Sequence, residues 1–296
     1  MLILSAAAVV IFSFQTYKRI STSAAAAGNN ADEERQILTI HLIGERHCGT
    51  KWITKHIEDC FGSQVTVLNR YTRFKHWFQY DDVTSFPTNS AIVVVMFRDP
   101  YQWVNAMQKK PYHALDHYNL SWDRFVKLEW TIERGEKDKE LIDSNATNNV
   151  TCVHRFSFNE VVPCTIQDRN NWYNDTHSYT NRGLMYELNQ DGSGNPYQNI
   201  VDLRRDKIKN FLSIRNYPAV AAFFPVQYEY VVSRGTADLI SEIETVTGVH
   251  AQCEKSPPRE LPLKQLDDNY VKWMNEHVDW DVEAMIGYYK TSESAT

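Results

Sequence analysis

Two apolar, β-rich runs, each ending at a polar turn before a helical pattern, constrain the fold of this chain more than any other feature. The first covers Ile37–Ile43 and stops at Gly44, and apolar residues then recur at helical spacing from Thr50. The second, Ala91–Phe97, also leads into a helical pattern. Runs that are apolar at nearly every position are typical of parallel strands buried on both faces. Because these strands alternate with helices, we predict a three-layer α/β/α fold with a mostly parallel central sheet and a strand–phosphate loop–helix unit.

The rest of the chain continues this alternation, with one interruption. The remaining periodic segments predict a helix over 200–214, a strand over 225–232, a helix over 237–247 that ends at Gly248, and a last helix over 268–288. Residues 141–197 hold no period for long and are rich in Asn, Asp, Ser, Thr and Gly, which predicts a polar surface insertion. We therefore expect one domain over residues 35–290, and the 43% hydrophobic content is enough to fill its core.

The first 34 residues are of a different kind. Leu2–Phe14 is almost wholly apolar and is followed by Lys18 and Arg19. Because about 20 residues are needed to span a bilayer, this run is short for a transmembrane helix and suits the core of a signal peptide. Cations placed after the apolar run do not favour a signal anchor with a cytoplasmic N-terminus. We expect a targeting segment and stem over residues 1–34, either cleaved or retained as a single-pass membrane anchor.

Two further features favour the secretory pathway. Cys152 and Cys164 flank a short polar stretch and could form a disulfide in an oxidising lumen, whereas unpaired thiols in a cytosolic protein are the alternative. The acceptor pattern for N-glycosylation occurs at Asn119, Asn145, Asn149 and Asn174. Together with the apolar start, these features predict a luminal glycoprotein.

The net charge of −6 gives the chain no general affinity for polyanions, so we expect no nucleic-acid partner, and any anion must bind to a local site. The turn over residues 44–52 is the strongest candidate. Glycines at a strand-to-helix turn let successive N–H groups point into one concavity, and the helix adds the positive end of its dipole. The side chains of this turn suited to a phosphate are Arg46, His47, Thr50 and Lys51. An ordinary tight turn is the alternative.

The turn is not a Walker A loop, the phosphate loop of Mg²⁺-dependent nucleotide hydrolases. That motif ends in Gly-Lys-Ser/Thr, whereas here Thr50 precedes Lys51. The hydroxyl that should follow the lysine, which is the usual Mg²⁺ ligand, is therefore missing. A nucleotide donor that works without a metal fits this turn better.

Together with Arg98-Asp99-Pro100, the turn resembles the sulfotransferases that use 3'-phosphoadenosine 5'-phosphosulfate (PAPS). In that family a Ser-Gly-Thr loop followed by an aromatic residue holds the 5'-phosphosulfate, and a strand ending in Arg-Asn/Asp-Pro holds the 3'-phosphate. The loop positions are taken here by Cys48, Gly49, Thr50 and Trp52, and the second motif begins at Arg98. The resemblance implies a P-loop-like sulfotransferase of the Golgi membrane or lumen, which transfers the sulfuryl group of PAPS to a hydroxyl acceptor without a metal.

Two positions depart from the family pattern. The basic residue expected just before the Ser-Gly-Thr loop is His47, with Arg46 one place earlier, and which cation meets the 5'-phosphate stays open. The serine expected eight residues after Arg98 is Ala106, so Asn105 or a residue elsewhere must supply the missing contact.

Sulfuryl transfer also needs a base that takes the proton of the acceptor hydroxyl. The family places a His or Glu between the two phosphate motifs, which implies His76, with Glu58 and His113 as the other candidates. A histidine with an ordinary pKa near 6.5 accepts a proton around neutral pH. Lys51 or Lys75 would assist the leaving group. A surface histidine in an aromatic stretch is the structural alternative for His76.

Two other functions stay open. A phosphate-loop kinase would need Mg²⁺ ligands and an acidic end to the second strand, which ends in Arg98 instead. A secreted binding module that kept the fold and lost the chemistry is favoured slightly by Ala106. Residues 255–259 form a basic loop that could close over the 3'-phosphate or simply be solvated. Nothing in the residues identifies the acceptor, and family analogy alone favours a glycan.

Overall fold

The computed structural model of the chain describes residues 39–81, 87–112, 114–135, 181–186, 189, 197–260 and 266–291. The sequence predictions that lie outside these residues are the targeting segment over 1–34, most of the insertion over 141–197, the glycosylation patterns at Asn145, Asn149 and Asn174, the cysteines Cys152 and Cys164, and the candidate base His113. Asn119 is described, and it lies exposed on the surface.

The elements in chain order are β1 (Thr39–Gly44), α1 (Thr50–Phe61), η1 (Gly62–Gln64), β2 (Thr66–Leu68), β3 (Ala91–Phe97), α2 (Pro100–Lys109), η2 (Leu115–His117), α3 (Trp122–Lys127), β4 (Thr131–Gly135), β5 (Asn181–Tyr186), α6 (Ile200–Ser213), η3 (Ile214–Asn216), β6 (Val220–Gln227), α7 (Tyr228–Arg234), α8 (Ala237–Thr247), α9 (Asp268–His277) and α10 (Trp280–Ala284). The η elements are short 3₁₀ helices.

The central sheet has four strands in the order β2-β1-β3-β6, and all of its pairings are parallel. Every residue of β3 is buried, as expected for a strand that has neighbours on both sides and helices on both faces. The edge strand β6 contains Pro225, which is exposed and has no N–H to donate, a residue that sheets tolerate at an edge. The predicted α/β class with a parallel sheet is confirmed.

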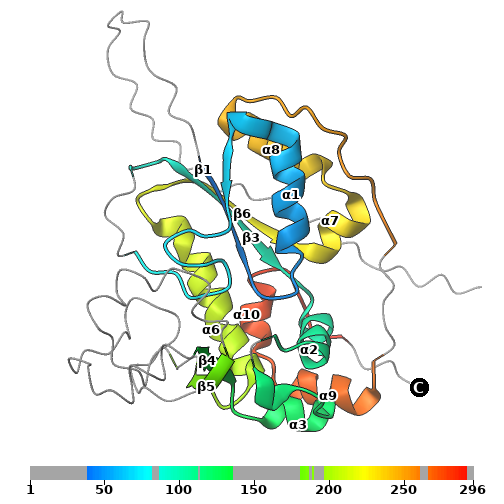
Figure 1. Ribbon diagram of the computed structural model, residues 1–296. Helices are drawn as coiled ribbons and strands as arrows, with labels where there is room; N and C mark the ends of the chain where they lie inside the picture. The colour runs from blue at the N-terminus through cyan, green and yellow to red at the C-terminus, as the bar shows by residue number, and fades with distance from the viewer. Residues whose placement is uncertain are drawn as a thin grey trace, which may run out of the picture.

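Alternating side chains of the strands build one core on each face of the sheet. Ile40 and Leu42 of β1 pack on the face that α1, α7 and α8 cover. Ile43 packs on the other face, against α6 and α10 (Figure 1). Because neighbouring residues of a strand point to opposite sides, one apolar run supplies both cores. The result is consistent with three layers, α/β/α.

Beyond the carboxyl ends of the strands lie α2, α3 and α9, at the same end of the sheet as the antiparallel pair β4–β5 (Figure 1). Helix α2 follows β3 directly: Asp99 caps it by accepting a hydrogen bond from the Gln102 N–H (2.9 Å), and Pro100 occupies its first turn. Both are ordinary signals for the start of a helix, so Asp99 and Pro100 need no functional explanation.

The structure corrects three predicted boundaries. The strand expected over 225–232 is β6 at 220–227, and Tyr228 already begins α7. The single helix expected over 268–288 is divided into α9 and α10 at Asp279, whose carboxylate accepts from the Val282 N–H (3.1 Å) and caps the second helix. Within the insertion, residues 181–186 form β5 rather than an irregular loop. In each case a tertiary contact or a cap overrides a local preference.

One disulfide joins Cys60, at the end of α1, to Cys253. This pairing across 193 residues was not predicted, because the sequence only suggested the closely spaced pair in the insertion. Cys48 is a buried free thiol. Among the described residues, no helix combines the length and apolar character needed to cross a membrane.

Candidate functional site

The candidate site lies where the strand order of the sheet reverses direction. From β1 the chain moves outward to β2 on one side, and it then returns to β3 on the other side of β1. The loops that leave β1 and β3 therefore diverge from neighbouring strand ends. In open parallel sheets, ligands bind in the crevice at this switch point. Both predicted anion motifs are at this place: residues 44–52 follow β1, and Arg98 follows β3.

The loop after β1 has two residues in the left-handed backbone region, His47 (φ 63°) and Gly49 (φ 78°), a conformation that also occurs in anion-binding turns. Between them, the Cys48 N–H bonds back to the Glu45 oxygen (3.3 Å). The first bond from helix α1 back into the loop is from the Ile53 N–H to the Gly49 oxygen (3.2 Å). The amides that precede Ile53 in α1 have no acceptor within the helix, and the helix has no side-chain cap. The N-terminus of α1 therefore presents N–H donors and a positive dipole end.

Close packing explains both glycines of the loop. A Cβ on Gly44 would lie 2.6 Å from the Met96 oxygen of β3, and one on Gly49 would lie 2.6 Å from the ring of Tyr228. Tyr228 is the first residue of α7, directly after β6, and its ring packs against the loop at Gly49. Only a residue without a side chain fits at either position without moving its neighbours.

Arg98 joins the two motifs directly. Its Nη1 donates a hydrogen bond to the backbone oxygen of His47 (3.0 Å), and its guanidinium lies 5.1 Å from the ring centroid of Tyr228. The side chain keeps 22% of its surface exposed. A half-buried guanidinium at a strand end, beside the N-terminus of a helix, is the strongest positive feature of the site.

A carboxylate shares this place with Arg98. Glu229, in the first turn of α7, accepts hydrogen bonds from the Asp99 N–H (3.2 Å) and from the hydroxyl of Tyr288 (2.6 Å), and its Oε1 lies 3.9 Å from Arg98 Nε. Desolvation by burial raises the pKa of Glu229, against the hydrogen bonds that lower it. Because the carboxylate lies beside Arg98, a bound phosphate would compete with it for the guanidinium.

A buried ion pair between Arg204 and Glu283 lies against the end of β3. Arg204 of α6 is almost fully buried, and its guanidinium contacts both carboxylate oxygens of Glu283 (2.5 and 2.9 Å). The same Arg204 donates to the Arg98 backbone oxygen (2.7 Å) and lies 4.9 Å from the ring centroid of Trp103. Burial alone would lower the pKa of Arg204, but the charge of Glu283 outweighs it and raises that pKa. Arg204 therefore stays charged, and its bond to the Arg98 oxygen fixes the backbone from which Arg98 extends.

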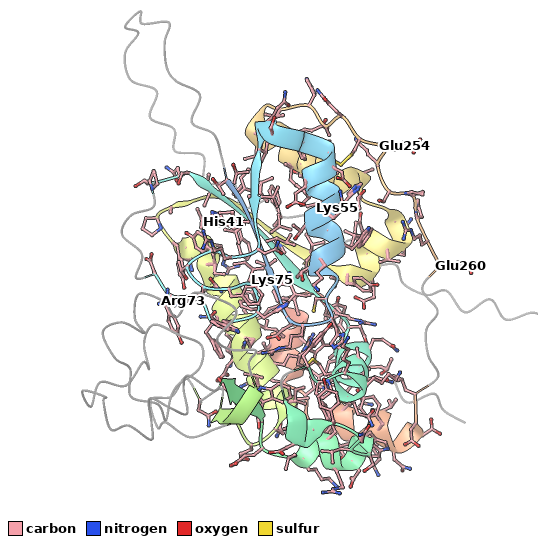
Figure 2. The ribbon with its side chains drawn as sticks, viewed as in Figure 1. His41, Lys55, Arg73, Lys75, Glu254 and Glu260 are labelled. Carbon is pink, nitrogen blue, oxygen red and sulfur yellow. A yellow bond between two sulfur atoms is a disulfide. The ribbon has the colours of Figure 1, made fainter. Side chains whose placement is uncertain are left out.

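His76 lies beside the loop, as a base would have to. Its Nδ1 lies 2.6 Å from the Gly44 oxygen at the end of β1, and the neighbouring Lys75 oxygen accepts from the Gly44 N–H (3.0 Å). Lys75 is labelled in Figure 2, where this segment passes the carboxyl end of β1. Lys207 of α6 donates a hydrogen bond from Nζ to the His76 backbone oxygen (2.5 Å), which joins this segment to α6.

The protonation state of His76 follows from these contacts. Desolvation lowers its pKa well below 6.5, and the charges of Arg46, Lys75 and Lys207 lower it further against the bond to Gly44. The neutral ring must then carry its proton on Nδ1 to donate to the Gly44 oxygen. Nε2 is left as an acceptor, and within the described part of the chain it makes no hydrogen bond. His76 is thus a neutral imidazole with one lone pair available.

The three cations considered for the 5'-phosphate have different surroundings. Arg46 is buried with its guanidinium 5.9 Å from the Trp130 ring centroid, and its own oxygen accepts from Trp103 Nε1. The His47 ring bonds the Lys110 oxygen (2.8 Å), and burial lowers its pKa, so it is neutral at pH 7. Lys51 is exposed on the first turn of α1. Of the three, Lys51 is the cation that reaches solvent at this helix end.

The remaining predicted residues have simpler roles in the structure. Cys48 is fully buried, and burial raises the pKa of its thiol, which makes it a packing residue rather than a nucleophile. Thr50 is buried in the first turn of α1. Asn105 is half-buried on α2, and no hydrogen bond of its side chain is found among the residues described. That Asn105 supplies the phosphate contact of the missing serine stays a prediction.

Glu58, the other described candidate for the base, is not in the site. It is exposed near the C-terminal end of α1, and its oxygen accepts from the Gly62 N–H beyond that helix. Eight residues of helix separate it from Thr50, a rise of about 12 Å. Helix α1 therefore carries Glu58 away from the loop at its N-terminus.

The basic loop over 255–259 lies along α1. Arg259 extends its guanidinium over the ring of Trp52 (5.7 Å to the centroid), and its N–H bonds the Val232 oxygen (2.7 Å). Trp52 is half-buried in the first turn of α1, close to the candidate anion site. The loop thus places one cation near the N-terminus of α1.

Several residues of the site were missed by sequence reasoning. They are Arg204, Lys207, Tyr228, Glu229 and Tyr288. For the two cations a signal existed: Ile200, Arg204, Lys207 and Phe211 recur at helical spacing on one buried face of α6. A cation on an apolar helix face implies a buried partner or a functional role. For the aromatic and acidic residues we find no comparable local signal.

Comparisons with protein-family models, with curated proteins and with solved structures found no match. What the site can do chemically is therefore inferred from its side chains and backbone groups alone. It combines helix amides and a guanidinium that attract an anion with a neutral histidine that can accept a proton.

Proposed function

We propose that this chain is a sulfotransferase that uses PAPS as donor and transfers its sulfuryl group to a hydroxyl acceptor. The observation that carries the proposal is the contact between the two anion motifs. The loop after β1 and Arg98 after β3 lie at neighbouring strand ends, with Arg98 Nη1 3.0 Å from the His47 oxygen. Two separate anion sites that lie close together suit a nucleotide that carries phosphates at both its 3' and 5' positions. The β1–loop–α1 unit would then act as a P-loop-like cradle for the 5' end.

The reaction assigns a separate task to each group. The acceptor oxygen attacks the sulfur, and the bond from sulfur to the bridging phosphate oxygen breaks, leaving adenosine 3',5'-bisphosphate. Negative charge builds on that phosphate oxygen, where the amides of α1 and the cation of Lys51 would stabilise it. Arg98 would hold the 3'-phosphate. None of these tasks requires a metal ion.

The proton of the acceptor would go to His76. Its Nε2 is a lone-pair acceptor because Nδ1 is committed to the Gly44 oxygen (2.6 Å). This bond also fixes the direction of the ring, as the partner of a catalytic histidine commonly does. The lowered pKa keeps the ring neutral, and therefore able to accept a proton, throughout the neutral range. Burial and the charges of Arg46, Lys75 and Lys207 disfavour a long-lived imidazolium, so the proton must pass on to solvent after each turnover.

One observation favours a second candidate, a binding module without catalysis. Glu229 stands 3.9 Å from Arg98 Nε and would repel a phosphate placed there. A transferase has to protonate this carboxylate or move it when the donor binds. A binding module that no longer binds PAPS would keep the contact between Arg98 and Glu229 for structural reasons.

The proposed compartment is the Golgi membrane or lumen. The disulfide between Cys60 and Cys253 supports it, because disulfides persist in oxidising compartments. The exposed Asn119 could there carry a glycan. Family analogy makes a carbohydrate hydroxyl the proposed acceptor, with the segment over 1–34 as leader or membrane anchor.

Isothermal titration with adenosine 3',5'-bisphosphate tests the proposal. We expect binding in the presence of a metal chelator, because the turn lacks the hydroxyl after the lysine that is the usual Mg²⁺ ligand of phosphate loops. Binding of ATP that depends on Mg²⁺ would instead indicate a kinase, and binding of neither ligand would leave the non-catalytic module. A positive result is followed by a screen of glycans and lipids with labelled PAPS, which identifies the acceptor class.

A further inference from the structure

The segment over residues 249–260, here called the strap, runs antiparallel along α1 and is tied to it at three levels. Cys253 is bonded to Cys60, and Arg259 covers the ring of Trp52. Between these levels, Ser256 lies beside His56. Glu254 and Glu260 mark the exposed course of the strap in Figure 2. A chain held this way keeps its side chains in fixed positions opposite one face of α1.

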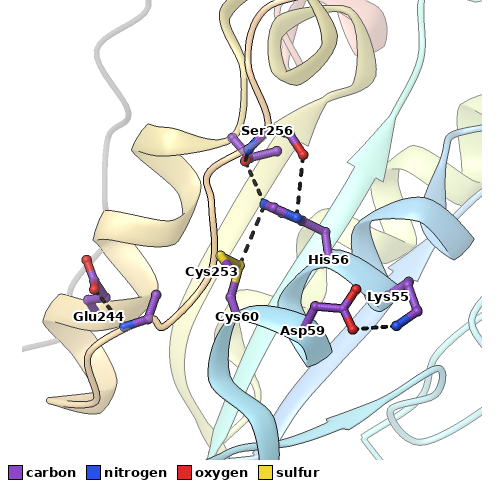
Figure 3. The surroundings of a disulfide bond; sticks show 9 residues. Lys55, His56, Asp59, Cys60, Glu244, Cys253 and Ser256 are labelled. Carbon is purple, nitrogen blue, oxygen red and sulfur yellow. Dashed lines mark hydrogen bonds and ion pairs between the residues drawn. A yellow bond between two sulfur atoms is a disulfide. The ribbon is translucent and has the colours of Figure 1, made fainter.

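The contacts at Cys253 and Ser256 bring together three side chains of types that bind metals. His56 and Cys60 are four residues apart on α1 and therefore point from the same face. Cys253 adds a second sulfur from the strap, and one donor atom from each of these residues lies within 4.8 Å of the other two. Figure 3 shows the imidazole of His56 beside the disulfide. Two sulfurs and one imidazole nitrogen form a ligand set typical of zinc.

The spacing on α1 already matches a tetrahedral metal. The His56 Nε2 atom lies 3.7 Å from the Cys60 Sγ atom. Zinc bonds of about 2.1 Å to nitrogen and 2.3 Å to sulfur, at a tetrahedral angle, place those two atoms about 3.6 Å apart. The spacing of these two atoms therefore already fits the metal. Two thiolates on the same metal lie about 3.8 Å apart, so the half-buried Cys253 would have to move outward on the exposed strap.

The hydrogen bonds around His56 orient the ring for this role. The Thr236 hydroxyl lies 2.7 Å from Nε2, and Ser256 Oγ lies 3.5 Å from Nδ1. Thr236 Oγ1 also accepts from the Ser256 N–H (2.9 Å), which ties the strap to the start of α8. With its proton on Nδ1, directed at Ser256, the ring keeps a lone pair on Nε2. In the disulfide form that lone pair accepts from the Thr236 hydroxyl, and a metal would have to displace this bond. Histidines that bind metals commonly donate their second nitrogen to such an outer partner.

We propose that His56, Cys60 and Cys253 bind one thiophilic divalent cation, such as zinc, when the disulfide is reduced. A dithiol reductant supplies two electrons and two protons, the sulfur–sulfur bond breaks, and the reductant leaves as its own disulfide. The cation then displaces the two thiol protons and bonds both sulfurs and Nε2. A water molecule completes the four ligands. The disulfide and the metal are thus alternative ties between the strap and α1, independent of the proposed transfer reaction.

Cobalt(II) is the probe for this site, because its bonds to thiolates are visible by absorption spectroscopy. The full chain is reduced and kept without oxygen, and the reductant is removed before cobalt is titrated. We expect one equivalent to bind with a cobalt–thiolate absorption band and to be displaced by zinc. The variants Cys60→Ser, Cys253→Ser and His56→Ala should each weaken binding at least about tenfold, since each removes a direct ligand. The oxidised protein should show no thiolate band.

Two controls make the result decisive. Cys48→Ser removes the buried thiol outside the cluster and should bind cobalt as the unmodified chain does. Circular dichroism establishes which variants fold. If reduction alone unfolds the chain, zinc should restore its thermal transition, and should fail to do so in His56→Ala, because a ligand that binds only the folded state stabilises it. Absence of cobalt binding in a folded, reduced chain overturns the proposal. Unchanged binding in Cys253→Ser does the same.

Discussion

The guanidinium of Arg98 donates a hydrogen bond from Nη1 to the backbone oxygen of His47, 3.0 Å away. This bond joins the ends of β1 and β3, which carry the two anion motifs. It also shows that one nitrogen of Arg98 is committed to the protein, while Nε faces Glu229. The two predicted anion motifs are therefore already in contact, and a carboxylate lies beside Arg98.

Replacing Arg98 tests the 3'-phosphate site. We expect Arg98→Ala to lower the affinity for adenosine 3',5'-bisphosphate about 10- to 100-fold, since a hydrogen bond to a charged group contributes about 1.5–3 kcal/mol. Isothermal titration measures the change, and circular dichroism checks the fold. Arg124→Ala, at an exposed position on α3, is the matched control and should bind normally. Unchanged affinity in Arg98→Ala would show that the phosphate binds elsewhere.

Glu229 makes nucleotide binding depend on pH. Its pKa is raised above the usual value of 4.5, so the carboxylate gains a proton as the pH falls through that raised value. Protonation removes the negative charge beside Arg98, and affinity for the bisphosphate should therefore increase toward acid pH. Glu229→Gln should bind more tightly at pH 7 and lose this part of the pH dependence. Parallel titration curves for both proteins would contradict the predicted competition.

His76 should affect turnover without affecting donor binding. We expect His76→Ala to reduce the rate about 10²- to 10⁴-fold, the usual contribution of a general base, with unchanged affinity for the bisphosphate. Because the histidine pKa is lowered, the rate in the unmodified chain should stay flat from pH 8 to pH 6.5 and fall only at lower pH. Steady-state rates across this range provide the measurement. Equal losses of rate and affinity would make His76 a structural residue.

Gly49 should tolerate no side chain, because of Tyr228. Gly49→Ala introduces a Cβ that would lie 2.6 Å from the Tyr228 ring, at a left-handed φ of 78°. Gly248→Ala is the matched control, since φ there is 67° but no atom lies within 4 Å of the added carbon. Strain at φ costs on the order of 1 kcal/mol in both variants. Urea denaturation should show Gly49→Ala to be the less stable, and Tyr228→Ala should restore part of the difference.

Glu283 should matter for stability more than any exposed carboxylate. Glu283→Gln leaves the buried Arg204 charged without its counterion, which costs about 3–5 kcal/mol. The double variant Arg204→Met/Glu283→Leu should cost less, since it removes both charges together. Glu276→Gln, at an exposed position on α9, should change the free energy of unfolding by no more than about 0.5 kcal/mol. A double variant less stable than Glu283→Gln would contradict this account.

Much of the fold could be predicted because its signals are local. The runs before Gly44 and Arg98 are apolar at nearly every position, a pattern typical of strands buried on both faces. Asp99 and Pro100 mark the start of α2, and Gly248 marks the end of α8, because caps and backbone angles depend on neighbouring residues. The placement of both anion motifs at strand ends follows from the same signals.

The composition of the site was less predictable because it depends on contacts across the chain. Glu229 lies beside Arg98 only because β6 ends there and Tyr228 begins a helix, against a local sequence that favours a strand. The pairing of Cys60 with Cys253 likewise follows from the course of the strap along α1. By itself the sequence determined the layers and which strand ends carry charge. The tertiary structure alone decided which charges meet, since that depends on packing distances no local pattern encodes.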